Sequence, residues 1–156
     1  MSSAPDCIFC KIIGGEVEAW PIWEDQDYIA FLTPFPNTPG FTVVAPKRHL
    51  TSDVLALPAA EYFGLMNAAK HVAGVLTKAL NVKRTGLIVE GMGVDHAHAK
   101  LIPMHGIPDG PWKPMLSSRP EFSTEYLGFI TTHDGPRMAD EELERIQLLV
   151  RNASAL

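Results

Sequence analysis

The order of the predicted elements indicates a protein of the α+β class. Short apolar, β-branched segments come first, one long helical segment follows, and further strands and a last helix complete the chain. Strands and helices grouped in this way are typical of α+β folds. The chain has 156 residues, of which 46% are hydrophobic, so we expect residues 1–156 to form a single domain with one core.

Three strands are predicted in the first third of the chain. Residues 28–32 (YIAFL) are short and apolar, and the turn-forming sequence TPFPNTPG follows them. Residues 41–47 (FTVVAPK) are rich in β-branched side chains, and the strand is expected to stop at Pro46. Residues 19–25 (AWPIWED) are predicted as the third strand of this group.

The longest predicted element is a helix that runs from Pro58 to Asn81. Proline suits the first turn of a helix, and asparagine is a residue type that commonly ends one. The apolar residues that recur at helical spacing are Tyr62, Leu65, Met66, Ala69, Val72, Ala73, Leu76 and Leu80.

The second half of the chain is predicted as a strand pair, a loop and a last helix. Residues 85–91 and 95–105 are expected to form strands around the turn GMG. Residues 106–120 are rich in proline and glycine and should form an ordered loop or lid. The last helix should begin near Asp140, a favourable N-cap followed by two glutamates that stabilise the positive end of the helix dipole. Its predicted buried stripe consists of Leu143, Ile146, Leu149 and Val150.

The composition argues against several classes of partner. The formal net charge is -5 and no block of Lys or Arg is present, so binding to a nucleic acid polymer is not expected. An anionic substrate would have to be held by a local cluster of charge. No apolar stretch approaches the roughly 18–20 residues that span a bilayer, so no membrane segment is predicted. The segment MSSAPD does not resemble a secretion signal, and we therefore expect a cytoplasmic protein.

The sequence HAHAK at residues 96–100 carries the strongest signal for chemistry. On a strand, side chains alternate, so His96, His98 and Lys100 should share one face while small apolar residues share the other. One interpretation is a half-exposed strand with a solvated polar face. Another is a catalytic strand, because a neutral imidazole is a competent nucleophile toward phosphorus. The charge of Lys100 should lower the pKa of His98, and its ammonium should stabilise phosphate oxygens.

The chain has two cysteines, Cys7 and Cys10, in a C-x-x-C arrangement. They are either a pair of buried or redox-active thiols or half of a metal site. A tetrahedral site needs two more ligands, for which His49 and one of the two histidines of HAHAK are candidates. A closed set of two cysteines and two histidines indicates a structural zinc ion.

Three motifs, CIFCKIIGGE, FTVVAPKRH and HAHAKL, resemble the histidine triad family of nucleotide hydrolases and transferases. The resemblance covers residues 7–105 and agrees best with the bacterial branch that keeps a C-x-x-C zinc site. It implies a homodimer in which each subunit is an antiparallel sheet of about five strands with helices packed on it. The implied substrate is a nucleotide or nucleotide conjugate, and the implied cofactor is a structural zinc ion.

The resemblance also assigns roles to individual residues. His98 matches the histidine that is transiently nucleotidylated, His96 matches the first histidine of the signature, and Lys100 stands where a third histidine belongs. Thr33 occupies the place of an aspartate that binds ribose hydroxyls. The implied zinc ligands are Cys7, Cys10, His49 and His96. The residues that match the apolar pocket for the base are Ile8, Phe9, Ile12, Val17 and Phe31.

The segment EGMGVD departs from the family pattern. A glutamine and a serine usually precede the signature on a phosphate-binding loop, and Val94 and Asp95 stand there instead. Backbone N–H groups from Gly91 to Gly93 can still hold a phosphate as a nest. Two hypotheses follow. The first is an enzyme that acts on nucleoside phosphoramidates or dinucleoside polyphosphates. The second is a weakly catalytic nucleotide-binding or partner-binding module that keeps the fold and the zinc site.

Overall fold

The computed structural model describes residues 6–132 and 135–153, and for residues 149–153 it describes the backbone alone. The chain divides into two units, residues 1–109 and 110–156, and each is described by itself. The core expected from the sequence, residues 7–105, falls in the first unit. Whether residues 1–156 behave as a single domain stays a prediction. In the described part of the chain, no helix is long and apolar enough to cross a bilayer.

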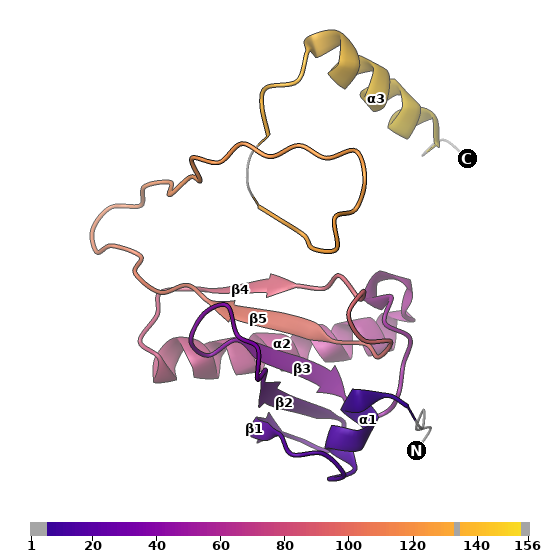
Figure 1. Ribbon diagram of the computed structural model, residues 1–156, viewed down its shortest axis with the longest axis vertical. Coiled ribbons are helices and arrows are strands. Elements are labelled where there is room, and N and C mark those ends of the chain that lie inside the picture. The colour runs from indigo at the N-terminus through magenta and orange to yellow at the C-terminus, as the bar shows by residue number, and fades with distance from the viewer. Residues whose placement is uncertain (1–5, 133–134, 154–156) are drawn as a thin grey trace. The chain divides into compact units, whose positions relative to one another are not determined.

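The first unit is built on a five-stranded antiparallel sheet, which confirms the predicted α+β class (Figure 1). The strand order is β1-β2-β3-β5-β4, with the last strand of the chain inserted between β3 and β4. The strands are β1 (Trp20–Glu24), β2 (Tyr28–Leu32), β3 (Thr42–Pro46), β4 (Thr85–Ile88) and β5 (Ala99–Pro103). Strand β1 has an irregular register between Pro21 and Trp23, which suits its place at the edge of the sheet, where proline is tolerated.

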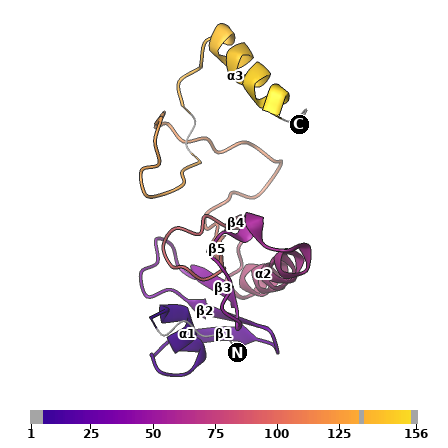
Figure 2. The same ribbon diagram turned by 90° about the vertical axis from the view of Figure 1, so that its right-hand side faces the viewer.

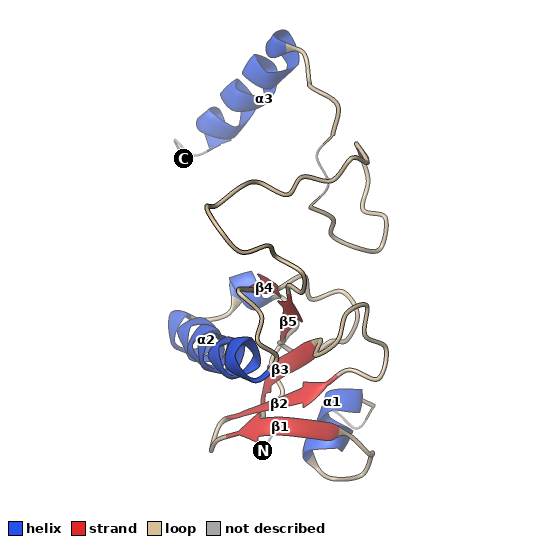
Figure 3. Cartoon of the chain, turned by 90° about the vertical axis from the view of Figure 1, so that its left-hand side faces the viewer, coloured by secondary structure: helices blue, strands red, loops and turns tan. Residues whose placement is uncertain are grey.

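The two faces of the sheet carry different helices. Helix α2 (Ala59–Ala79) covers one face and α1 (Ile8–Ile13) lies against the other, as views from two opposite sides show (Figures 2 and 3). Because side chains alternate along a strand, Val44 packs with the α2 residues while its neighbour Val43 packs beside α1. The core on the α2 side consists of Ala30, Val44, Val54, Leu65, Ala68, Ala69, Val72, Leu76, Ala97, Ala99 and Leu101.

Helix α2 agrees with the prediction from apolar periodicity. It begins directly after Pro58, and Asn81 follows its end with a left-handed φ of 51°. Asparagine tolerates this conformation better than most residues, which is why it commonly terminates helices. A short 3₁₀ helix, η1 (Val54–Ala56), precedes α2. Helix α1 was not predicted from the sequence.

The predicted strand over residues 95–105 is wrong at its beginning, because β5 starts at Ala99 and both histidines precede it. The backbone of this segment bonds outside the sheet. The N–H of Ala97 donates to the carbonyl of Leu50 at 2.9 Å, and the N–H of His96 donates to the carbonyl of Val94 at 2.8 Å. The alternation of side chains nevertheless persists, since Ala97 packs with the α2 core and the histidines lie on the α1 side.

The described residues of the second unit contain one helix, α3 (Asp140–Ala153), which confirms the predicted C-terminal helix. Between residues 110 and 139, no helix or strand occurs among the described residues. The prediction of a buried stripe on α3 is wrong for Leu143, whose side chain is 48% exposed. Leu149 and Val150 lie outside the residues whose side chains are described.

Candidate active site and metal centre

Two loops carry the histidines of the site, and direct contacts hold these loops together. One loop follows β3 and contains His49; the other joins β4 to β5 and contains His96 and His98. Besides the bond between Ala97 and Leu50, the carboxylate of Asp95 accepts a hydrogen bond from the N–H of Ser52 at 3.2 Å. These bonds bring His49 and His96 together, with ring centroids 5.1 Å apart.

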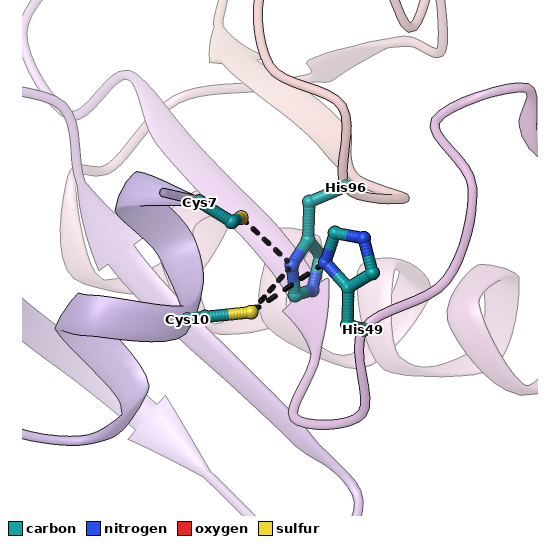
Figure 4. Close-up of side chains that lie close together, drawn as sticks. All are labelled: Cys7, Cys10, His49 and His96. Carbon is teal, nitrogen blue, oxygen red and sulfur yellow. Dashed lines mark hydrogen bonds between the residues drawn. The ribbon is translucent and has the colours of Figure 1, made fainter. Parts of the chain in front are cut away.

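Four side chains converge on one point between α1 and these loops and form a candidate metal site (Figure 4). They are Cys7, Cys10, His49 and His96, and their ligand atoms all lie within 4.8 Å of one another. The Sγ of Cys7 lies 3.4 Å from Nδ1 of His96, and the Sγ of Cys10 lies 3.5 Å from Nδ1 of His49 and 3.7 Å from Nδ1 of His96. The two cysteines are not joined by a disulfide bond.

The orientation of His96 suits a metal ligand. Its Nε2 lies 2.8 Å from the carbonyl oxygen of Pro46. Because a carbonyl can only accept, Nε2–H must donate, and the lone pair of Nδ1 is left to face the two sulfur atoms. The side chain is fully buried, and this burial lowers the pKa of the imidazole, which favours the neutral form that binds metal ions.

A hydrogen bond to a backbone carbonyl also fixes the orientation of the His98 ring. Its Nδ1 lies 2.7 Å from the carbonyl oxygen of His96, so Nδ1–H donates and Nε2 keeps a free lone pair. The ring stands edge-on to Phe9 at 5.3 Å. Burial is the main cause that lowers the pKa of His98, and the charge of Lys100 lowers it further, while Glu90 acts in the opposite direction. The neutral imidazole is thereby favoured.

Lys100 forms an ion pair with Glu90, a residue that the sequence did not single out. The two side chains are 24% and 12% exposed, so the pair is largely removed from solvent. Lys100 lies opposite Val43 of β3 and opposite Ile88 of β4, and Glu90 follows two residues after the end of β4. Only the pairing of β4 with β5 brings these residues together, which is why no local sequence signal marks Glu90.

His98 and Lys100 line a cavity of about 510 Å³ on the α1 side of the sheet. Most residues predicted for nucleotide binding line the same cavity, namely Ile8, Phe9, Ile12, Val17, Phe31, Thr33 and Gly93. Gly91 and His96 are not among the lining residues. The sequence missed nine further lining residues, which are Glu18, Ala19, Trp20, Leu32, Pro34, Phe35, Phe41, Val43 and Val94. The aromatic character of three of them is a signal that could have pointed to a ligand surface.

Thr33 stands at the rim of this cavity, where the family pattern has an aspartate. Its Oγ1 accepts a hydrogen bond from the N–H of Phe35 at 3.2 Å. The hydroxyl therefore helps to form the turn after β2, and it offers no carboxylate to a ligand.

Comparisons with known proteins show which family the chain resembles. The family model of the HIT domain matches residues 15–107. The protein Hit of Bacillus subtilis is 30% identical over 149 residues, which cover 89% of this chain and 99% of that protein.

Solved structures resemble the fold as well. A crystal structure of a HIT family protein from Bacillus anthracis superimposes with a TM-score of 0.61 at 28% identity, covering 97% of this chain and 99% of that one. A HIT family hydrolase from Clostridium thermocellum gives a TM-score of 0.58 at 27% identity, covering 70% of this chain and 98% of that one. The domain match spans most of the chain, and the chain belongs to the histidine triad (HIT) family.

Proposed function

We propose that this protein is a nucleotide hydrolase or nucleotidyl transferase that works through a nucleotidylated His98. The proposed substrates are nucleoside phosphoramidates or dinucleoside polyphosphates. The observation that carries the proposal is the orientation of the His98 imidazole. Its Nδ1–H donates to the carbonyl of His96, so Nε2 keeps its lone pair, and the side chain lines the cavity. The name of the solved HIT family hydrolase from Clostridium thermocellum supports hydrolysis as the reaction type.

The proposed reaction has two steps. In the first, Nε2 of His98 attacks phosphorus, and the bond from phosphorus to the leaving group breaks with its electron pair going to the leaving group, which takes up a proton from solvent when it is an amine. In the second, water or another acceptor attacks phosphorus and gives its proton to solvent, and the electron pair of the phosphorus–nitrogen bond returns to the imidazole. The ammonium of Lys100, which lines the same cavity, is proposed to donate hydrogen bonds to the phosphoryl oxygens as negative charge builds up.

The remaining cavity residues are proposed to hold the nucleoside. Phe9 and Phe31 pack edge-to-face with ring centroids 5.4 Å apart, and they form an apolar wall suited to the flat face of a base. Ile8, Ile12 and Val17 are proposed to extend this wall, and Thr33 to lie near the sugar. Backbone N–H groups from Gly91 to Gly93 are proposed to hold the phosphate.

We also propose that the metal is a structural zinc ion. Ideal tetrahedral zinc, with bonds of about 2.3 Å to sulfur and about 2.05 Å to nitrogen, separates a sulfur from a nitrogen ligand by about 3.6 Å. Three of the four sulfur–nitrogen separations in the cluster, at 3.4, 3.5 and 3.7 Å, fit this value, and all ligand atoms lie within 4.8 Å of one another. Four protein ligands leave no open position, so the ion would brace α1 against the histidine loops. The homodimer and the cytoplasmic location expected from the sequence stay predictions.

The test is to detect the covalent intermediate. The wild-type chain is mixed with excess adenosine 5′-phosphoramidate or diadenosine tetraphosphate and analysed by intact-protein mass spectrometry. An adenylyl adduct should form on the wild type and be absent from His98→Ala. His105→Ala is a matched control, because His105 is exposed, bonds to the carbonyl of Pro39 and does not line the cavity. An adduct that persists in His98→Ala would refute the proposed role of His98.

The second candidate is a binding module with little catalytic activity. Two observations favour it: the ammonium of Lys100 is engaged by Glu90, and the hydroxyl of Thr33 is engaged by a turn. Calorimetric binding of adenosine nucleotides with no adduct and no product would support the module. An adduct that depends on His98 would support the enzyme.

A further inference from the structure

The charge around the cavity is unusual for a site that handles phosphates. Among the residues of the first unit that line it, Lys100 is the only lysine or arginine, and Glu18 is the only carboxylate. Glu18 is exposed, so it contributes negative potential at the rim. The site therefore depends on one ammonium for attraction of an anion.

Glu90 offsets part of that attraction. Its carboxylate is paired with the ammonium of Lys100, and both side chains are shielded from bulk solvent, so the partial cancellation of charge is screened little by salt. The register of β4 and β5 fixes the pair, since Ile88 lies opposite Lys100 and Glu90 follows two residues later. The Lys100–Glu90 pair therefore adds a net charge close to zero to the polar side of the cavity.

A site in which Glu90 offsets the charge of Lys100 should bind leaving groups of different charge with different affinity. A lysine ammonium has three donors, so Lys100 can keep Glu90 and still bind one phosphoryl oxygen at His98. A polyphosphate chain places several further negative charges in the same region, and no further lysine or arginine lines the described cavity to receive them. An uncharged or cationic leaving group meets no such repulsion, and the exposed carboxylate of Glu18 attracts a cationic one.

We propose that Glu90 is a specificity-determining residue, which by cancelling the charge of Lys100 makes the site favour nucleoside monophosphate conjugates with an uncharged or amine-containing leaving group over polyphosphates. This inference rests on the proposed function, and it chooses between the two substrate classes named above. If the Lys100–Glu90 pair only stabilised the fold, its disruption would lower the free energy of unfolding and would leave the preference between ligands of different charge unchanged.

Binding of AMP, ADP and ATP tests the inference without turnover. Calorimetry on the full-length wild type at one fixed ionic strength should show that ATP binds no more than about threefold more tightly than AMP. Glu90→Gln should raise the affinity for ATP relative to AMP by on the order of tenfold, because the ammonium is no longer compensated. Glu61→Gln is a matched control: it makes the same change of charge in an ion pair, with Arg48, that lies outside the cavity, and it should leave the ratio unchanged.

A double variant tests whether the change in the ratio of ATP to AMP affinity is caused by charge. Glu90→Gln combined with Lys100→Gln restores the net charge of the pair to zero, so the ratio of ATP to AMP affinity should return to within about threefold of the wild-type ratio. If the wild type forms the adenylyl adduct, the ratio of kcat/KM for the phosphoramidate over the dinucleoside tetraphosphate should also fall by about tenfold in Glu90→Gln.

The outcomes separate this inference from the function on which it rests. A wild type that forms the adduct while Glu90→Gln keeps the wild-type preference refutes the inference alone. A wild type that already binds ATP more than about tenfold better than AMP also refutes it. A wild type that binds none of the three nucleotides and forms no adduct refutes the proposed function and this inference together.

Discussion

Replacement of Gly91 by alanine tests the contact between the two histidine-bearing loops. Gly91 has a φ of 69°, in the left-handed region that alanine rarely adopts. A Cβ at this position would lie 2.3 Å from the carbonyl oxygen and 3.0 Å from the carbonyl carbon of Ser52. Both atoms belong to the backbone, so they cannot rotate away. The loop that carries His49 would have to move.

The expected loss of stability follows from these two effects. The left-handed conformation costs an L-residue about 1–2 kcal/mol. Displacement of packed backbone costs about 1–3 kcal/mol more. The lower entropy of the unfolded chain with alanine offsets about 0.4–1 kcal/mol. We therefore expect Gly91→Ala to lower the free energy of unfolding by about 1–5 kcal/mol.

Urea unfolding of the two variants Gly91→Ala and Gly93→Ala measures this effect against a matched control. Gly93 is two residues away, its φ is not positive, and its added Cβ would meet nothing within 4 Å. Gly93→Ala should stay within about 1 kcal/mol of the wild type. The reasoning fails if Gly91→Ala is within about 0.5 kcal/mol of the wild type, or if Gly93→Ala loses more stability than Gly91→Ala.

Two further predictions concern the metal site and the core. The purified chain should hold about one zinc ion, and Cys7→Ser should lose most of it and unfold at a lower temperature, because metal binding is coupled to folding. Elemental analysis measures the zinc content, and thermal unfolding with and without a chelator measures the stability. Full zinc content in the variant would contradict the four-ligand site. Leu65→Ala should lower the free energy of unfolding by about 2–5 kcal/mol, since Leu65 of α2 is 1% exposed and packs in the core between the helix and the sheet. Leu55→Ala, at a position 73% exposed, should change it by less than about 1 kcal/mol, and equal losses in urea unfolding would contradict the assigned core.

The elements that were predicted correctly have a strong local pattern of apolar residues, and those residues pack into the core. The apolar segment 28–32 coincides with β2, and the helical spacing of apolar residues after Pro58 matches α2. The four candidate metal residues could also be picked out from the sequence, because cysteine and histidine are uncommon and the two motifs have characteristic spacing, and the structure brings their side chains together. In each case the local signal and the tertiary environment favour the same structure.

The features that were missed depend on contacts between distant segments. Residues 95–98 have a sequence suited to a strand, but the carbonyl of Leu50 takes the hydrogen bond of Ala97 and draws the segment out of the sheet. Glu90 becomes important only because β4 pairs with β5. Helix α1 has six residues, too few for a periodic pattern to be recognised.

The cysteine–histidine cluster also has a consequence for the order of events during folding. Cys10 and His49 are separated by 39 residues, and Cys7 and His96 by 89. Closure of such long loops is entropically unfavourable in an unfolded chain, so the C-x-x-C pair alone offers an ion only two ligands until β3 and β5 have paired. Uptake of metal by all four side chains would therefore be a late step, and its rate during refolding would report when the centre of the sheet is complete.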